Sequence, residues 1–501
     1  MLERRSRLVL LAPALLFLVY LLPLRGGFTD DGFIHIQYAR NLIALGEYSF
    51  NPGEVSFGTS SPLWVLMLAA IGCFSEGGES LIWISRVLSW LAGFAALAVV
   101  FFFAIEAGAR RYTAFLATCV FATHVWFARW TALSMESSVA VLAVALVGFA
   151  SVRAVDDCRD AALMGALIAL AGLVRQEVYL ALPLIVLIAA TGGGVRGRRS
   201  AMVALAAAAA LLVPWFAFAK LHIGTFLPNT AAAKSVGLAL GPAAIAERIG
   251  PIAKIVASSE GVPALALAVS LLVLRGRSRI LDRRNRFMLL WVVALPAMFI
   301  VLGVQVLSRY MLLISPMVAV LGWLAIEELS DRFVAAGSRR ALMGCLAAIA
   351  IVLSAFFYTL VVLPPSRAFA EDLKGRMKGV ALYLDAHAAA EAVVAAADIG
   401  YLAFYGKRRV LDLGGLVEPI TGELRSQHSY EEIVDRGLYF GLPSYARVDY
   451  FIDRDLERDR FEGRILAGHR FEKVFETTVR CLGIRKPGPY HYTLYELSKV
   501  D

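Results

Sequence analysis

Long apolar segments separated by short polar loops fill the first part of the chain. About eleven of these segments have the length or the apolar character of membrane helices. They lie near residues 8–24, 80–107, 112–128, 131–151, 161–174, 178–194, 201–219, 255–274, 287–304, 310–326 and 341–363. The apolar run 62–74 is too short to span a bilayer and predicts an interfacial or re-entrant helix. The pattern therefore predicts an all-α polytopic membrane domain over residues 1–363.

The pattern changes after residue 363. Residues 366–501 are charged, and short apolar runs with the period of strands alternate with helical patterns. Strand-like runs lie at 392–397, 409–413, 448–453 and 492–497, and helical patterns lie near 367–390 and 429–438. We therefore expect a small α/β domain over residues 364–501.

Composition supports a membrane protein. The chain is 59% hydrophobic and 18% charged, with a mean hydropathy of +0.68, which excludes an ordinary soluble domain of this length. The net charge of +9 reflects arginines in short loops between apolar segments, so it is not a sign of nucleic-acid binding. The five cysteines are scattered without a CxxC or CxxH spacing, which argues against a disulfide framework or a zinc site.

The distribution of arginine predicts the topology. Arg4, Arg5 and Arg7 precede the first apolar run, which is long and lacks a good cleavage site, so we expect an uncleaved helix rather than a signal peptide. Arginine then recurs in every second loop, at 110–111, 153–159, 196–199, 275–286 and 332–340. The positive-inside rule places these loops and the N-terminus in the cytoplasm. A bacterial inner membrane with residues 364–501 on the periplasmic side fits this arrangement.

The first external loop, residues 25–79, carries two adjacent acids. Asp30 and Asp31 stand at the start of an amphipathic helix with Phe33, Ile34 and Tyr38, which we expect to lie on the membrane surface. One acid would suffice to cap this helix. The alternative is that one carboxylate is a general base beside a lipid-borne substrate.

Two other outward loops carry charged residues, one a single acid and the other a pair, with two interpretations each. Glu136 stands at the start of a membrane helix. Its negative charge could simply be stabilised by the positive end of the helix dipole, or its side chain could face a substrate. Arg175 and Glu177 interrupt apolar sequence; they could form a mutual ion pair, or Glu177 could hold Arg175 against a phosphate.

Cations recur in two further outward loops. Asn229 belongs to a Pro-Asn-Thr turn, and Lys234 follows it on the outer side, where a lysine can bind phosphate as a point charge. Arg309 and Tyr310 begin another helix; Arg309 could extend along the bilayer to reach water, or it could bind the phosphate of an isoprenoid donor.

Carboxylates and cations gathered at one face of a bilayer suit the transfer of a sugar from a lipid phosphate. A carboxylate accepts the proton of the acceptor hydroxyl, and cations stabilise the leaving phosphate. No P-loop or nucleotide-binding glycine motif is present. We expect no divalent metal or other cofactor, since the only DxD-type sequence, Asp453 to Asp455, is interpreted as a solvated turn.

The order of these motifs resembles the GT-C superfamily of membrane glycosyltransferases that use polyprenyl-phosphate sugars. The likeness extends over nearly the whole chain. Within the superfamily, the chain is similar to a bacterial branch that includes the mycobacterial arabinan-capping arabinofuranosyltransferases. The matching motifs are Thr29-Asp30-Asp31-Gly32, Phe50-Asn51-Pro52-Gly53-Glu54, Ser134-Met135-Glu136, Arg175-Gln176-Glu177, Pro228-Asn229-Thr230 with Lys234, Ser308-Arg309-Tyr310 and Asp398-Ile399-Gly400-Tyr401.

The resemblance implies a GT-C fold, a donor site between the first external loop and the membrane helices, and a catalytic carboxylate in the Asp30–Asp31 pair. Three positions depart from the common pattern. Ser134 replaces the glycine of Gly-Met-Glu, and Gln176 replaces the proline of Arg-Pro-Glu. Residues 231–233 are alanines where aromatic side chains are frequent, which weakens the assignment of a particular sugar.

The resulting hypothesis is a membrane glycosyltransferase that moves a sugar from polyprenyl phosphate to an envelope glycan, glycolipid or protein. D-arabinofuranose is the sugar that the resemblance suggests. Asp30 is the expected base, and Asp31 orients it or the sugar. The expected phosphate-binding residues are Arg175, Lys234, Arg309, Tyr310 and Asn229, and the expected positioning residues are Glu136, Glu177 and His35.

Two rival functions are weighed against this hypothesis. A transporter or lipid flippase places charges in broken helices near the bilayer midplane and often has inverted repeats, whereas here the charges lie at helix ends without internal symmetry. A scaffold or sensor that binds through its soluble domain would not need charged residues in five separate membrane loops.

Overall fold

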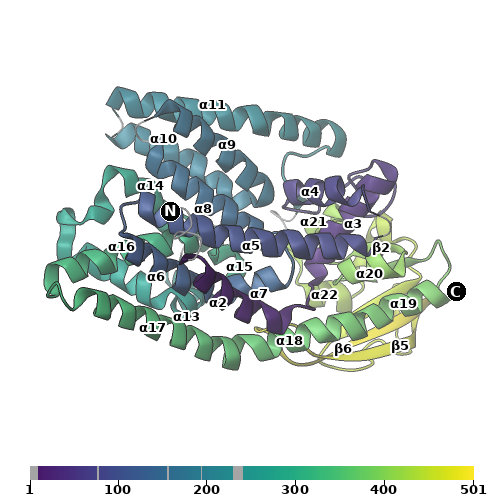
Figure 1. The fold of residues 1–501 in the computed structure, drawn as a ribbon. Helices are drawn as coiled ribbons and strands as arrows, with labels where there is room; N and C mark the ends of the chain where they lie inside the picture. Colours follow the sequence, from purple (N-terminus) through teal and green to yellow (C-terminus); the bar gives the residue numbers. More distant parts are fainter. Residues whose placement is uncertain (1–8, 76–77, 155–156, 193, 230–240, 501) are drawn as a thin grey trace.

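The computed structural model describes residues 9–75, 78–154, 157–192, 194–229 and 241–500. A bundle of helices is followed by a small sheet domain (Figure 1). The helices of the bundle and of the loop after its first helix are α2 (Leu11–Leu21), α3 (Asp30–Leu45), α4 (Pro62–Gly72), α5 (Ser80–Glu106), α6 (Arg111–Ala122), α7 (Val125–Ala132), α8 (Ser137–Arg153), α9 (Cys158–Val174), α10 (Ala181–Gly192), α11 (Gly194–Phe218), α13 (Pro242–Leu274), α14 (Arg286–Leu302), α15 (Ser308–Met311), α16 (Ser315–Phe333) and α17 (Arg339–Phe357).

Within the described ranges, five helical stretches are long and apolar enough to cross a membrane. They are Ser80–Glu106, Gly194–Ile223, Pro242–Arg277, Arg283–Leu302 and Arg339–His387. The other expected membrane segments are helical but shorter, and the expected segment 112–128 is divided between α6 and α7. A mostly helical membrane domain is therefore confirmed, whereas the count of eleven spans stays a prediction.

The α/β domain contains one mixed sheet of six strands. Its strands are β1 (Val393–Ala396), β2 (Arg409–Asp412), β3 (Tyr450–Asp455), β4 (Ile465–Leu466), β5 (His469–Cys481) and β6 (Pro487–Lys499), in the order β2-β1-β3-β6-β5-β4. The pairs of β1 with β2 and β3 are parallel, and the remaining pairs are antiparallel. Its helices are α18 (Leu363–Asp372), α19 (Lys378–His387), α20 (Gly400–Gly406), α21 (Pro419–Gln427) and α22 (Tyr430–Asp435). The four strands expected from the sequence are present, and β4 and β5 are additional.

Helical structure continues from the bundle into the sheet domain. The stretch Arg339–His387 is helical throughout, and α17, α18 and α19 follow one another along one side of the molecule (Figure 1). The expected domain boundary near residue 363 therefore lies within a continuous helical path.

One hydrophobic core joins the first external loop to the α/β domain. Phe33 of α3 contacts Tyr401 and Phe404 of α20, with ring centroids 4.1 and 5.1 Å apart. Phe33 and Tyr38 are buried in this core. The helix was expected at this position, but its expected placement with these residues on the membrane surface is wrong, because protein covers them.

The interpretation of residues 453–455 as a solvated turn is also wrong. These residues belong to β3, and the Asp453 side chain is buried. Burial, together with the neighbouring Asp455, raises the pKa of Asp453 to about 6 although the nearby Arg460 opposes the shift. Arg454 forms an ion pair with Asp398 at 2.6 Å.

Candidate functional site

The N-terminus of α3 is capped by Thr29, so the capping interpretation of the two acids is wrong. The Thr29 hydroxyl oxygen accepts a hydrogen bond from the backbone N–H of Gly32 at 3.1 Å. Asp30 and Asp31 occupy the first turn of the helix, where its dipole favours negative charge. Both carboxylates are therefore available for contacts outside α3.

Asp30 joins α3 to the α/β domain. Its carboxylate accepts hydrogen bonds from the backbone N–H groups of Tyr401 at 2.9 Å and Gly400 at 3.1 Å. Burial, reinforced by the negative charge of Asp398, raises the pKa of Asp30 to about 7. A carboxyl group with this pKa changes protonation near neutral pH, as a general base should.

Asp31 faces the membrane helices. Its Oδ2 lies 2.8 Å from the guanidinium of Arg309, and the Asp31 side chain is 47% exposed whereas that of Arg309 is 6% exposed. The guanidinium of Arg309 also lies over the ring of Trp130, 5.2 Å from its centroid. Trp130 donates a hydrogen bond from Nε1 to Ser308 at 2.9 Å, which fixes the ring beside Arg309. Arg309 is therefore held by Asp31 and Trp130, and the interpretation that its side chain extends along the bilayer only to reach water is wrong.

A chain of polar contacts lies next to the Asp31–Arg309 pair. Arg175 binds Glu136 at 3.0 Å and Glu177 at 2.6 Å, so the ion pair expected from the sequence is present and includes a second carboxylate. The second oxygen of Glu136 lies 3.5 Å from Nε2 of His35, and the His35 Nδ1 shares a hydrogen bond of 2.7 Å with Thr59. Four of the expected site residues thus form one connected network.

Two cavities meet at the Asp31–Arg309 pair. The smaller one, about 30 Å³, is lined by Asp31, His35, Glu136, Arg175 and Arg309 among others. The larger one, about 810 Å³, lies between the helix bundle and the α/β domain, and Asp30, Asp31 and Arg309 line it. The larger volume is within the range of ligand sites.

Five cations of the larger cavity were missed by the sequence analysis: Arg129, Lys254, Arg454, Arg485 and Lys486. Arg129 is 6% exposed, donates from Nε to the Ser366 hydroxyl at 2.8 Å and lies over Trp130 at 4.3 Å. A charged residue inside the apolar run Trp126-Phe127-Ala128-Arg129-Trp130 was a signal that could have found it. Lys254 and Arg454 come from α13 and β3, and only folding brings them to this site.

The walls of the larger cavity combine these cations with apolar side chains. Trp126, Trp130, Leu307, Phe357 and Val361 line it together with the charged groups. Such a cavity suits an amphiphile whose anionic head meets the cations and whose chain contacts the apolar walls.

Among the described residues, three expected site residues do not line these cavities: Asn229, Glu177 and Tyr310. Asn229 lines a separate cavity of about 340 Å³ with Phe57 and Arg409, and its backbone N–H donates to the Phe57 carbonyl at 2.9 Å. Lys234 lies outside the described residues. Tyr310 is buried beside the site, where the Arg175 guanidinium lies over its ring at 5.0 Å. No group of three or more potential metal ligands is present among the described residues.

Comparisons with known proteins identify the fold. Residues 368–495 match a family model described as a domain of unknown function, DUF8728. No curated protein matches the chain.

Three solved structures illustrate the likeness. ArnT from Cupriavidus metallidurans in the apo state has a TM-score of 0.64 at 14% identity, with 98% of each chain covered. The same protein bound to undecaprenyl phosphate has a TM-score of 0.57 at 14% identity, covering 97% of this chain and 98% of that one. AglB, an oligosaccharyltransferase from Archaeoglobus fulgidus, solved with an inhibitory peptide and a dolichol-phosphate, has a TM-score of 0.62 at 12% identity, covering 90% of this chain and 69% of that one. The GT-C fold expected from the sequence is therefore confirmed.

Proposed function

We propose that this protein is a membrane glycosyltransferase that moves a sugar from a polyprenyl-phosphate donor to an extracytoplasmic acceptor. The observation that carries the proposal is the cavity of about 810 Å³ in which Asp30, Asp31 and Arg309 meet between apolar walls. It offers both parts that such a donor requires, cations for a phosphate and an apolar surface for a chain. The fold that this chain shares with ArnT bound to undecaprenyl phosphate supports it.

In the proposed mechanism, Asp30 accepts the proton of the acceptor hydroxyl. The acceptor oxygen forms a bond to the anomeric carbon, the bond from that carbon to the phosphate oxygen breaks, and polyprenyl phosphate leaves with both electrons. Asp31, bound to Arg309 at 2.8 Å, holds the guanidinium toward the leaving phosphate and orients the sugar. Asp30 thus supplies a base for the acceptor hydroxyl, and the Asp31–Arg309 pair supplies an electrostatic stabiliser for the leaving phosphate.

Arg309, Arg129 and Lys254 provide the positive charge for the leaving phosphate. Because six cations border this cavity, these three among them, we propose that transfer needs no divalent metal. Glu136, Glu177 and His35 position Arg175, which contacts the phosphate or sugar from the smaller cavity. We retain Tyr310, Asn229 and Lys234 as candidate contacts to the donor.

The acceptor is an envelope glycan, glycolipid or protein, and the enzyme acts in a bacterial inner membrane with its α/β domain in the periplasm. D-arabinofuranose is the first donor sugar to test. The topology follows from the arginine-rich loops at the other ends of the helices.

The test is transfer of radiolabelled sugar from a panel of synthetic polyprenyl-phosphate donors by the purified full-length protein, with and without EDTA. We expect transfer from one donor, unchanged by EDTA and lost in the Asp30→Asn, Asp31→Asn double variant. Binding of every donor without transfer to any acceptor, together with lipid movement in vesicles, would contradict the proposal and favour a flippase.

A further inference from the structure

The large cavity beside Asp30 contains more positive charge than its own acids balance. Arg309 is paired with Asp31 at 2.8 Å, and Arg454 is paired with Asp398 at 2.6 Å. No acidic side chain of the described residues forms an ion pair with the other cations that line the cavity, which are Arg129, Lys254, Arg485 and Lys486. The cavity therefore favours ligands that carry negative charge.

The proposed donor accounts for only part of this charge. A polyprenyl-phosphate sugar carries a single negative charge as a phosphodiester, and the phosphate that leaves carries about two at most, because its second pKa is about 6. Arg129 and Lys254 already match the charge of that phosphate. Arg485 and Lys486 remain, so a second anionic group is needed to balance them.

The two remaining cations belong to the turn between β5 and β6, which folds against the bundle. The backbone N–H of Leu482 donates to the Lys486 carbonyl at 3.0 Å and closes the turn. Ile484 packs against the hydrophobic core of the bundle. Arg480, near the end of β5, binds Asp372 of α18 at 3.0 Å. The fold therefore presents both cations to the cavity from an anchored turn.

This turn reaches the Arg309 side of the cavity and stays open to water. Neighbouring protein removes part of the water around Arg485 and lowers its pKa, whereas Tyr310, which follows Arg309, raises it. Both turn cations are nonetheless exposed, whereas Arg129 and Arg309 are buried. The buried cations suit a phosphate that arrives with its lipid chain, and the exposed ones suit a ligand that arrives from water.

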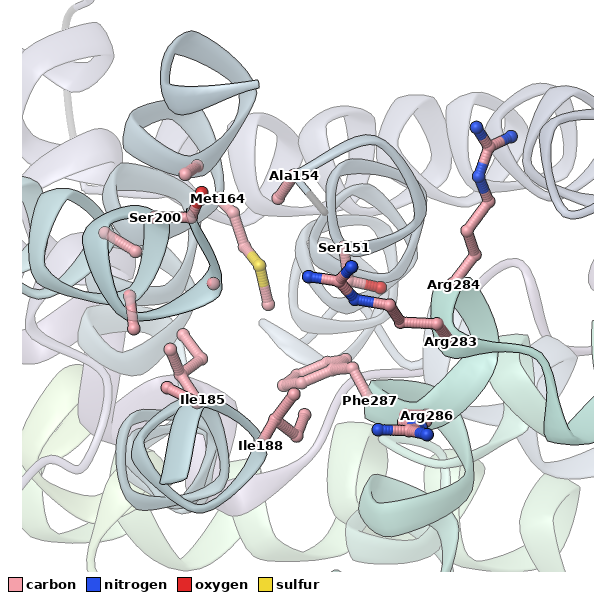
Figure 2. Close-up of a pocket in the computed structure, with 15 residues that line it drawn as sticks. Ser151, Ala154, Met164, Ile185, Ile188, Ser200, Arg283, Arg284, Arg286 and Phe287 are labelled. Carbon is pink, nitrogen blue, oxygen red and sulfur yellow. The ribbon is translucent and has the colours of Figure 1, made fainter. Parts of the chain in front are cut away.

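A separate arginine-lined cavity in the bundle lacks a base for an acceptor. Arg283, Arg284 and Arg286 stand around it beside Phe287 (Figure 2). Its volume is about 80 Å³, and no carboxylate lines it within the described part of the chain. The larger cavity, in contrast, contains Asp30, the proposed base. Only the larger of these two cavities can therefore bring an anionic acceptor to a base.

We propose that Arg485 and Lys486 bind an anionic group of the acceptor, a phosphate or a carboxylate, while the donor phosphate contacts the cations of the membrane helices. The acceptor is then an acidic glycan or glycolipid whose charged group lies close to the hydroxyl that receives the sugar. This inference rests on the proposed glycosyl transfer, because it needs the donor in the same cavity.

The test is calorimetric titration of the purified full-length protein in neutral detergent after saturation with undecaprenyl phosphate. Glucose 6-phosphate binds to this complex, and glucose binds more weakly by roughly tenfold or more. In the Arg485→Gln, Lys486→Gln double variant the affinity for glucose 6-phosphate falls roughly tenfold or more, which is the loss expected for a charge-assisted hydrogen bond. The double variant still binds undecaprenyl phosphate.

Arg470→Gln with Lys499→Gln is the matched control, because both side chains are exposed on β5 and β6 but do not line the cavity. This control binds both ligands as the wild type does. Equal binding of glucose and glucose 6-phosphate, or an unchanged affinity in the double variant, would overturn the inference and leave the proposed function standing.

Two further outcomes separate the acceptor from the donor. Undecaprenyl diphosphate that binds more tightly than undecaprenyl phosphate and excludes glucose 6-phosphate would assign the turn cations to the donor and overturn the inference. Failure of undecaprenyl phosphate itself to bind the wild type would overturn the proposed function, and the inference with it.

Discussion

At the scale of single residues, the two adjacent acids of α3 have different surroundings. Asp30 is held by two backbone N–H groups of the α/β domain, and burial raises its pKa to about 7. Asp31 is half-exposed and faces Arg309 at 2.8 Å. The same residue type therefore serves two purposes, with Asp30 suited to proton transfer and Asp31 to holding a cation.

The first prediction concerns pH. If Asp30 is the base, it must be deprotonated, so kcat/KM for the donor rises with pH and levels off above about 7. The measurement is initial rates of transfer between about pH 5 and pH 9, where loss of a single carboxyl proton gives a tenfold rise per unit below the pKa. A profile that is flat across this interval would exclude Asp30 as the base.

The second prediction concerns Ser134, which has a φ of +62° where the resembling family often has glycine. It follows the C-terminal end of α7, a position at which glycine accommodates the left-handed conformation without strain. Ser134→Gly therefore raises the stability of the protein by about 1 kcal/mol, measured as a higher Tm.

Ser151→Gly is the control for that substitution. Ser151 is buried inside α8 with helical backbone geometry, where glycine is unfavourable, so this variant should lower Tm. A lower Tm in both variants would show that the strain at Ser134 does not limit stability.

At the scale of elements, the approach of α3 to α20 determines where the acids lie. A Cβ on Gly400 would come within 2.1 Å of the backbone oxygen of Asp30, so only glycine allows this contact. The packing of Phe33 on Tyr401 and Phe404 supports the same interface. The α/β domain thus positions α3, the helix that carries both acids.

The third prediction follows from this close approach. Gly400→Ala displaces α3 from α20 and lowers transfer by about a hundredfold, since small displacements of reacting groups are costly. Gly379→Ala in α19 is the control, because a Cβ there meets nothing within 4 Å. Equal activity of the two variants would mean that the α3–α20 contact does not position the site.

The sequence predicted elements with a strong local signal and missed those that depend on partners. The apolar helices and the strands β1, β2, β3 and β6 were expected from local patterns. β5 was missed because the charged side chains of His469–Cys481 mask its alternation, and its pairing with β6 is what makes it a strand.

The candidate site was predicted only in part, because some of its residues reach it only through contacts between elements that are distant in the sequence. Asp31, Glu136, Arg175 and Arg309 were expected near one another because membrane topology brings helix ends to one face, and they are near one another. Arg454 could not be expected there, since its place at the cavity depends on how the sheet docks on the bundle. The contact of Asp30 with α20 depends on the same docking.

At the scale of the whole molecule, the sheet domain lies at one end of the helix bundle (Figure 1). The acid- and cation-lined cavity lies beside this domain, and the arginine-rich loops belong to the other ends of the helices. This polarity predicts that the sheet domain and the arginine-rich loops lie on opposite sides of the membrane. The donor cavity would then open on the extracytoplasmic side.

The fourth prediction tests this polarity with cysteine labelling. Cys73, at the end of α4, is exposed and free. In a variant lacking the cysteines at 158 and 345, a membrane-impermeant maleimide added to spheroplasts labels Cys73. If Cys73 is also replaced and Ser338→Cys is introduced beside α17, labelling requires permeabilised membranes. The reverse pattern would invert the topology.

The measurement that tests the central claim most directly is donor kcat/KM for the wild type, Arg309→Gln and Arg332→Gln in parallel. Arg309 contacts Asp31 in the proposed donor cavity, whereas Arg332 is at the C-terminal end of α16 and does not line it. Loss of a group that stabilises developing charge reduces catalysis by about 100- to 1,000-fold. We therefore predict this loss for Arg309→Gln and wild-type transfer for Arg332→Gln; equal transfer by all three proteins would contradict the proposed site.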